Sequence, residues 1–106
     1  MRLLFHLLDI YRSIFEEETR PQFFKLKHEQ EAHQQYVARL RESRFNILRQ
    51  AIEMARVHGL QLDDRDVDLC LNHHDDGAAA RVLASLEKQL PEREEVEYVK
   101  VVNPFE

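Results

Sequence analysis

The densest group of potential metal ligands is the stretch DDRDVDLCLNHHDD, residues 63–76. Four of its carboxylates have the spacing of positions 1, 3, 5 and 12 of an EF-hand calcium loop: Asp64, Asp66, Asp68 and Asp75. That loop needs Gly at position 6 and a bidentate Glu at position 12, where this sequence has Leu69 and Asp75. Apolar residues also alternate through the stretch, as they do in a core segment. We therefore expect no calcium site.

The single cysteine lies in the same stretch. Cys70 and His73 have C-x-x-H spacing, and His74 follows directly. A structural zinc site needs two further ligands, and His28 and His33, five residues apart, do not form a comparable pair. We expect these side chains to be surface or packing residues, with no metal and no cofactor. One cysteine cannot form an internal disulfide, which fits a reducing cytoplasm.

Nucleophilic and phosphate-binding chemistry also lacks the necessary residues. Ser13, Ser43 and Ser85 fall within predicted helices, with no sharp turn to expose a hydroxyl. The glycines are Gly59 and Gly77 alone, so no glycine-rich phosphate loop exists. We predict that the protein is not an enzyme.

Charge is distributed unevenly along the chain. The net charge is -5, yet residues 20–58 carry eight basic and four acidic side chains, and residues 59–106 carry five basic and twelve acidic ones. The favoured interpretation is that the basic middle lies against the acidic C-terminal part. The alternative is a nucleic-acid surface. The arginines of the middle segment do not share one helix face and the pI is near 5.7, so we expect no nucleic-acid partner.

Composition indicates a single folded domain, residues 1–106, that is mainly α-helical. Hydrophobic residues make up 43% and charged residues 33%, while two glycines and three prolines are too few for the turns of an all-β domain. The opening MRLLFHLLDIYRSIFEE predicts an amphipathic helix with a broad apolar face. His6 and Asp9 interrupt its apolar run, so we expect neither a signal peptide nor a membrane span.

A long central helix is predicted next. Residues 22–58 contain no Gly or Pro, Pro21 suits a first helical turn and Gly59 suits the end. One such helix would be about 55 Å long, against a radius of gyration of about 13 Å for a compact domain. The apolar spacing changes phase between Leu40 and Phe45, which favours a kink near Ser43. Otherwise, the helix projects and pairs with another chain.

Two short helices are expected after Gly59. Asp63 or Asp64 begins the first, and Asp75 or Asp76 begins the second, which Pro91 ends. The second has a regular inner face made of Ala79, Val82, Leu83, Leu86 and Leu90. The alternation from Val67 to Leu71 also fits a strand, but the strong cap favours a helix.

The C-terminal tail predicts a short β-strand over residues 96–102, which Pro104 follows. A lone strand cannot pair its own backbone groups. It therefore pairs with a copy of itself, with the sheet edge of a partner, or with a strand near Val67. The residues expected to take part in self-association or strand pairing are Val96, Tyr98, Val99 and Val101.

By elimination, the sequence favours a small helical protein that binds another protein. Aliphatic and aromatic anchors on a helix supply most of the energy when a helix docks in a groove. The predicted partner-binding residues are Leu3, Leu4, Leu7, Leu8, Tyr11, Phe15, Phe23 and Phe24. They are also candidates for an ordinary core, and that alternative stays open here.

The opening MRLLFHLLDIYRSIF and the glycine-free run to MARVHG resemble the small bacterial antiactivators of quorum sensing. The resemblance implies a cytoplasmic homodimer that binds the ligand-binding domain of a LuxR-type transcriptional activator. It would separate the activator's dimer and keep it off DNA. Two other functions fit the acidic C-terminal half: an immunity or antitoxin protein, and an adaptor for a secretion system.

Overall fold

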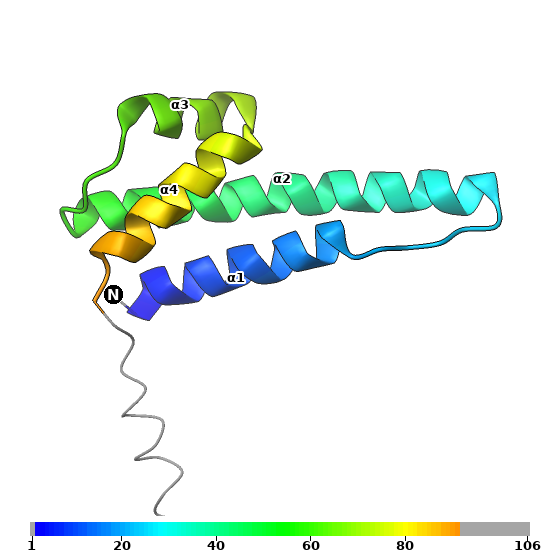
Figure 1. Ribbon diagram of the computed structural model, residues 1–106, viewed down its shortest axis with the longest axis horizontal. Coiled ribbons are helices and arrows are strands. Elements are labelled where there is room, and N and C mark those ends of the chain that lie inside the picture. The colour runs from blue at the N-terminus through cyan, green and yellow to red at the C-terminus, as the bar shows by residue number, and fades with distance from the viewer. Residues whose placement is uncertain (1, 92–106) are drawn as a thin grey trace, which may run out of the picture.

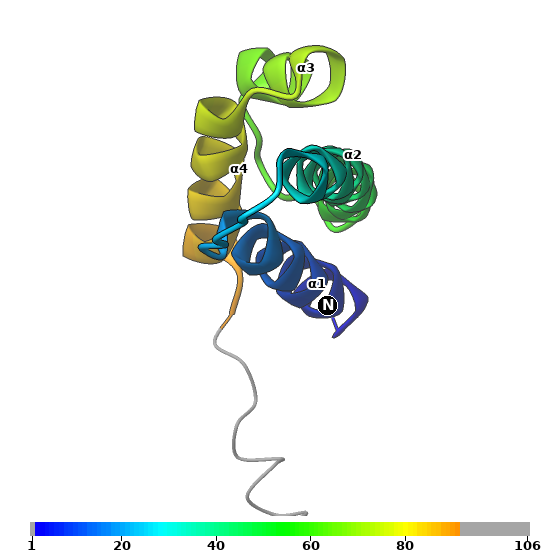
Figure 2. The ribbon, with the colours of Figure 1, turned by 90° about the vertical axis from the view of Figure 1, so that its right-hand side faces the viewer.

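The computed structural model describes residues 2–91, and these form four helices and no strand (Figure 1). The helices are α1 (Arg2–Thr19), α2 (Lys27–Val57), α3 (Asp64–His73) and α4 (Asp76–Gln89). α1 and α2 lie side by side as a hairpin, α4 crosses one side of that pair, and α3 lies beside α2 (Figures 1 and 2). The predicted strand, with Val96, Tyr98, Val99 and Val101, lies outside the described residues. The mainly helical fold with a long central helix is confirmed.

α1 is the amphipathic helix expected from the opening residues. Its buried side chains are Leu4, Leu7, Leu8 and Tyr11, which follow the three- and four-residue spacing of one helix face. This face packs along the C-terminal half of α2, the most extensive contact between helices in the described chain. The apolar face of α1 therefore supplies one side of the core.

α2 is one uninterrupted helix, so the predicted kink near Ser43 is wrong. The phase change between Leu40 and Phe45 has another cause. Leu48 is fully buried in the core, whereas Phe45 stacks on His74, the C-cap residue of α3, with ring centroids 4.6 Å apart. The apolar pattern shifts because the helix gains a second neighbour, and no bend is needed.

The start of α2 also differs from the prediction. Pro21 does not open the helix, because residues 20–26 are non-helical and α2 begins at Lys27 after Leu26, which makes no side-chain cap. With 31 residues, α2 is about 46 Å long. Its first half extends beyond the region covered by α3 and α4 (Figure 1), so the alternative of a projecting helix describes it better than a broken one.

The predicted end of α2 and both predicted caps are confirmed. Gly59 has φ +75°, a left-handed conformation that favours glycine, and its N–H donates to the Arg56 carbonyl. Asp63 accepts from the backbone N–H groups of Arg65 and Asp66, and Asp75 accepts from that of Ala78. These caps start α3 and α4, and the strand alternative around Val67 is wrong.

The core lies where α1, the second half of α2, α3 and α4 meet. Its buried members include Leu4, Leu8, Leu48, Ile52, Val67, Cys70, Val82 and Leu86. The predicted inner face of α4 is confirmed, with Ala79 buried and Leu83 and Leu90 packed at its edge. Among residues 2–91, no helix is long and apolar enough to cross a membrane.

Candidate functional site

The most buried charged side chain in the described chain is Arg44 of α2, which is 1% exposed. Its guanidinium donates to both oxygens of the Glu18 carboxylate near the end of α1. It also donates to the Tyr11 hydroxyl oxygen at 2.6 Å and, from Nη2, to Asp76 Oδ1 at 2.8 Å. Arg44 therefore joins three helices through one rigid, planar group.

Aromatic rings surround the same guanidinium. Its central carbon lies 4.8 Å from the ring centroids of Phe15 and Phe45 and 5.2 Å from that of Tyr11. Such contacts between a cation and aromatic faces are favourable, and they strengthen when water is excluded. The carboxylates, the hydroxyl and the rings together compensate for burying the charge.

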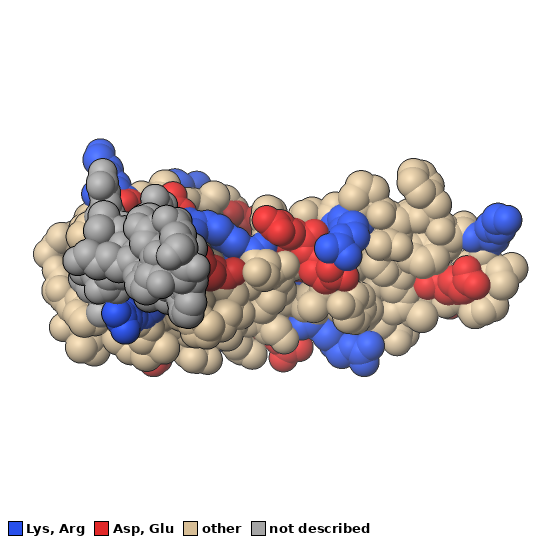
Figure 3. Space-filling view, turned by 90° about the horizontal axis from the view of Figure 1, so that it is seen from below, with Lys and Arg blue, Asp and Glu red and all other residues tan. Residues whose placement is uncertain are grey.

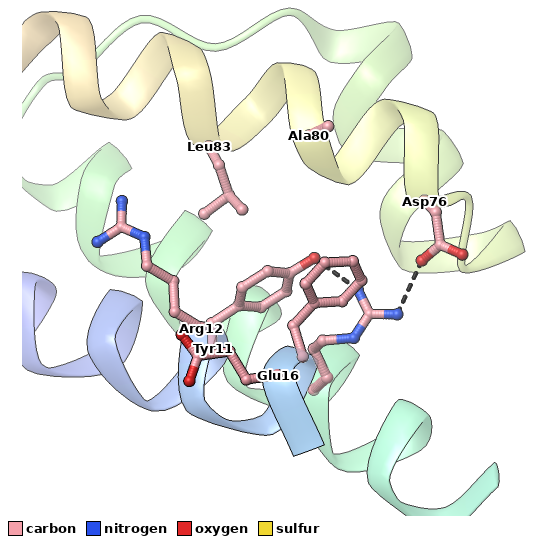
Figure 4. Close-up of a pocket in the computed structure, with 8 residues that line it drawn as sticks. Tyr11, Arg12, Glu16, Asp76, Ala80 and Leu83 are labelled. Atoms are coloured by element: carbon pink, nitrogen blue, oxygen red, sulfur yellow. Dashed lines mark hydrogen bonds and ion pairs between the residues drawn. The ribbon is translucent and has the colours of Figure 1, made fainter. Parts of the chain in front are cut away.

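A cleft of about 220 Å³ opens above this group, between α1 and α4 (Figure 4). Apolar side chains form most of its wall, with Arg44 and Asp76 at one end. The lining residues are Tyr11, Arg12, Phe15, Glu16, Arg44, Asp76, Ala80 and Leu83. The cleft contains no serine, cysteine or histidine, and Arg44 already bonds to protein groups. The cleft therefore offers a recess for an apolar group.

Electrostatics fixes the protonation state of the Arg44 cluster. Burial opposes the charge of Arg44, but hydrogen bonds to Glu18 and Asp76 outweigh it and raise the Arg44 pKa. Burial works against ionisation of Asp76 too, yet bonds from Arg41 and Arg44 hold its pKa below the ordinary value. Burial raises the pKa of Tyr11. At neutral pH the cluster therefore holds ionised Arg44 and Asp76 beside a neutral phenol.

Arg41 makes a second link between α2 and the start of α4. It donates to Asp76 Oδ2 at 2.6 Å and to the His74 carbonyl oxygen, and its guanidinium lies over the Phe45 ring. His74 has φ +48° and stacks flat on Phe45, with an interplanar angle of 4°. The left-handed backbone of His74 is therefore held by the hydrogen bond from Arg41 and by the stacked Phe45 ring.

Within the described part of the C-terminal half, up to residue 91, most acidic residues stabilise the fold. Besides the caps and Asp76, Asp66 pairs with Arg81 at 2.9 Å, and Asp64 lies 3.7 Å from Arg56 of α2. Three basic side chains of the middle segment, Arg41, Arg44 and Arg56, pair with Asp76 or Asp64, so the predicted contact between the basic middle and the acidic C-terminal part holds for these three within residues 2–91. Basic and acidic side chains are also interspersed on the face seen in Figure 3, where no basic stripe forms.

The eight predicted partner-binding residues fall into two groups. Leu4, Leu7, Leu8 and Tyr11 are core residues, at most 6% exposed, because their helix face packs on α2. As folded, the structure does not present these four to another protein. Leu3, Phe15, Phe23 and Phe24 are exposed, so partner contact stays a prediction for them.

Residues 20–26, which we name the linker arm, carry three of the large exposed apolar side chains. Phe23 is 96% exposed, and Leu26 is half exposed. The Phe24 ring lies 4.9 Å from that of His33 on the projecting half of α2, and His33 in turn lies near Tyr36. The arm and this half of α2 therefore present aromatic groups outside the core.

The candidate metal ligands do not assemble. No group of three His, Cys, Asp or Glu side chains suited to a metal occurs among residues 2–91. Cys70 is fully buried in the core, and burial raises the pKa of its thiol to about 11. This thiol is a packing group.

Sequence reasoning missed the Arg44 cluster, although one signal for it was present. Arg44 lies four residues after Leu40 and four before Leu48, so it occupies the apolar row of α2. A charge in such a row must be buried with partners. The identities of those partners, Glu18 and Asp76, have no local signal.

Comparison with known proteins gives no relative for this chain: no protein family, no curated protein and no solved structure matches it.

Proposed function

We propose that this chain is a protein-binding module that acts as an antiactivator in the cytoplasm, without catalysis. It binds a LuxR-type transcriptional activator, blocks its dimerisation and so prevents DNA binding. The observation that carries the proposal is the exposure of Phe23, which is 96% accessible beside Phe24 on the linker arm. Large rings without a role in the core are typical anchors for another protein.

The binding surface differs from the one expected from α1. Leu4 and its buried neighbours stabilise the fold, whereas the linker arm and Tyr36 supply the contact. A receptor patch that normally pairs with another receptor subunit is apolar, and it would accept the two phenylalanines. Such an inhibitor competes by mass action and needs no reactive group.

The test mixes this protein with operator DNA and with the ligand-bound LuxR-type activators of the cell that makes it. We expect the wild-type protein to displace the activator from the operator DNA. We also expect it to form a complex with the activator whose mass corresponds to one activator subunit. The double variant Phe23→Ser, Phe24→Ser removes two exposed anchors and should weaken this complex at least about tenfold. Val57→Ser, which removes an exposed apolar side chain at the other end of α2 where Val57 is 79% exposed, is the control.

Two results would contradict the proposal. One is a receptor that stays on DNA in the presence of excess wild-type protein. The other is a phenylalanine variant as potent as the Val57→Ser control. Charge reversal at the exposed Asp64 and Asp68 tests the immunity alternative, because slower association with a basic toxin would require those charges. An antiactivator that uses the linker arm should be unaffected by that reversal.

A further inference from the structure

The apolar recess of about 220 Å³ between α1 and α4, which we name the Arg44 cleft, has the size of a small-molecule site. Tyr11 and Phe15 form its wall on α1, and Ala80 and Leu83 form its wall on α4. In Figure 4, Leu83 projects from α4 towards the Tyr11 ring. An apolar cavity of about 150 Å³ accommodates benzene. The Arg44 cleft therefore has room for one aromatic ring with a short chain.

Ion pairs connect the two sides of the Arg44 cleft. Arg44 of α2 pairs with Asp76 at the start of α4, with 2.8 Å between Nη2 and Oδ1. Arg12 of α1 pairs with Glu87 near the end of α4. The apolar wall of α4 lies between these two positions, so both ends of the recess are fixed. A ligand would enter a preformed space and would lose little affinity to rearrangement of the protein.

The arginines that line the Arg44 cleft already have carboxylate partners. Arg44 donates to Glu18 and Asp76. Arg12 pairs with Glu87. An anionic ligand would have to displace one of these carboxylates, and it would meet the others as like charges. The arginines therefore do not make the cleft an anion site.

Two carboxylates that line the cleft can still accept a hydrogen bond. Glu16 is exposed and forms no ion pair within residues 2–91. The Asp76 side chain is 53% exposed, and each of its oxygens accepts one bond from an arginine, which leaves an acceptor site on each. A positively charged ligand is favoured because nearby carboxylates outnumber nearby cations. These groups are Asp9, Glu16, Glu18, Asp76 and Glu87 against Arg12, Arg41 and Arg44.

We propose that the Arg44 cleft binds a small aromatic amine, in which a short chain joins one ring to a protonated amino group. The ring lies between Phe15 and Leu83, and contacts with the Phe15 and Tyr11 rings favour an aromatic group over an alkyl chain. The ammonium group donates to Glu16 at the edge of the cleft, and Asp76 adds to the negative potential there. The linker arm contributes no residue to this cleft, so the proposal goes beyond receptor binding and does not depend on it.

The probe is 2-phenylethylamine, titrated into the isotope-labelled full chain and followed by the NMR shifts of the backbone amides. We expect saturable binding with a dissociation constant on the order of 1 mM, which a ligand of about nine non-hydrogen atoms can reach. The largest shifts should come from residues 11–16 and 80–83, on the two walls. The neutral analogue 2-phenylethanol should bind about threefold more weakly, and the anion phenylacetate more weakly still.

Two variants test the recess and the charge separately. Ala80→Phe places a ring in the recess and should abolish binding of 2-phenylethylamine, whereas Ala38→Phe, the same change at an exposed position of α2, should not. Glu16→Gln should weaken binding of the amine about threefold and leave binding of 2-phenylethanol unchanged. Glu42→Gln, at an exposed position of α2, is the matched control and should leave both constants unchanged.

Three results would overturn the proposal. The first is the absence of a saturable shift with 2-phenylethylamine up to about ten times the expected dissociation constant. The second is phenylacetate that binds as tightly as the amine. The third is a set of shifted amides centred on Phe23 and Phe24, which would place the ring on the linker arm. The shifts are measured on the wild-type protein, so they locate the site even if Ala80→Phe does not fold.

Discussion

Arg44 in the middle of α2 and Asp76 in the first turn of α4 form an ion pair, with 2.8 Å between Nη2 and Oδ1. The two residues are 32 positions apart in the chain. The carboxylate also lies at a helix N-terminus, where the helix dipole favours negative charge. This pair fixes the start of α4 on the hairpin, and it gives the first two predictions.

Replacing Arg44 by Met should strongly destabilise the fold. The change removes the donor to Glu18, Tyr11 and Asp76, and it leaves the Glu18 carboxylate, whose side chain is 7% exposed, buried without its partner. Breaking a buried pair in this way costs about 3–5 kcal/mol in the free energy of unfolding, which urea denaturation measures. Arg49→Met, at an exposed position of α2, should cost within about 0.5 kcal/mol. Equal losses for the two variants would contradict the role of Arg44.

Asp76 should make stability depend on acidic pH. Its pKa in the folded state is below the ordinary 3.8, so the unfolded chain binds the proton more tightly. The stabilisation is therefore complete above the ordinary pKa and is lost as the pH falls through the lower folded value. Asp76→Asn should cost about 1 kcal/mol at pH 7, because the carboxylate is half exposed.

The pH dependence of that difference is the measurement. Urea denaturation of wild type and Asp76→Asn should give curves that converge as the pH falls below 3.8. Asp64→Asn is the control, since the Asp64 side chain is 98% exposed and only distantly paired. A constant gap between wild type and Asp76→Asn at every pH would argue against the depressed pKa.

Asp63, which caps α3, should contribute more to the free energy of unfolding than the neighbouring carboxylate of Asp64. Asp63→Ala removes the acceptor for two backbone N–H groups of α3 and should cost about 1 kcal/mol in thermal or chemical denaturation. Asp64→Ala, one residue later, removes no cap and should cost much less. Asp63→Asn should recover most of the loss, because Asn also caps helices. Failure of Asn to rescue would show that charge, not capping, matters.

Cys70 should be unreactive in the folded protein. Its thiol is fully buried and its pKa is raised to about 11, so the thiolate that attacks disulfide reagents is scarce at pH 8. Labelling by an aromatic disulfide should be slow in buffer and fast in denaturant. A thiol introduced at the exposed position Ser13 (Ser13→Cys) should react at once. Rapid labelling of wild-type Cys70 under native conditions would contradict the packed core.

Several elements could be predicted from the sequence because their signals are local. Asp63 and Asp75 bond to backbone groups within three residues of themselves, so their types and positions reveal the helix starts. Gly59 marks the end of α2 because its left-handed backbone, with φ +75°, depends on that residue itself and its N–H bonds to Arg56 three residues before. The kink near Ser43 was wrong because a phase shift in an apolar pattern reports a new neighbour as readily as a bend.

The candidate site was harder to predict, because burial depends on what covers a helix face. The apolar spacing of α1 places Leu4 and Leu8 on one face, but it does not reveal whether that face meets the core or another protein. Packing of α1 on α2 decides this and leaves Phe23 and Phe24 as the outward groups. The same packing buries Arg44, which the sequence alone did not separate from the other arginines of the middle segment.

The sequence by itself determined the helical content, the two capped starts and the amphipathic character of α1, since these depend on interactions within about one helical turn. Only the tertiary structure decided which apolar residues are enclosed and which cation is buried. Those outcomes rest on contacts such as Arg44 with Glu18 and Tyr11, 26 and 33 positions away. Chain segments so far apart meet only when the whole domain folds, and no short-range pattern encodes their pairing.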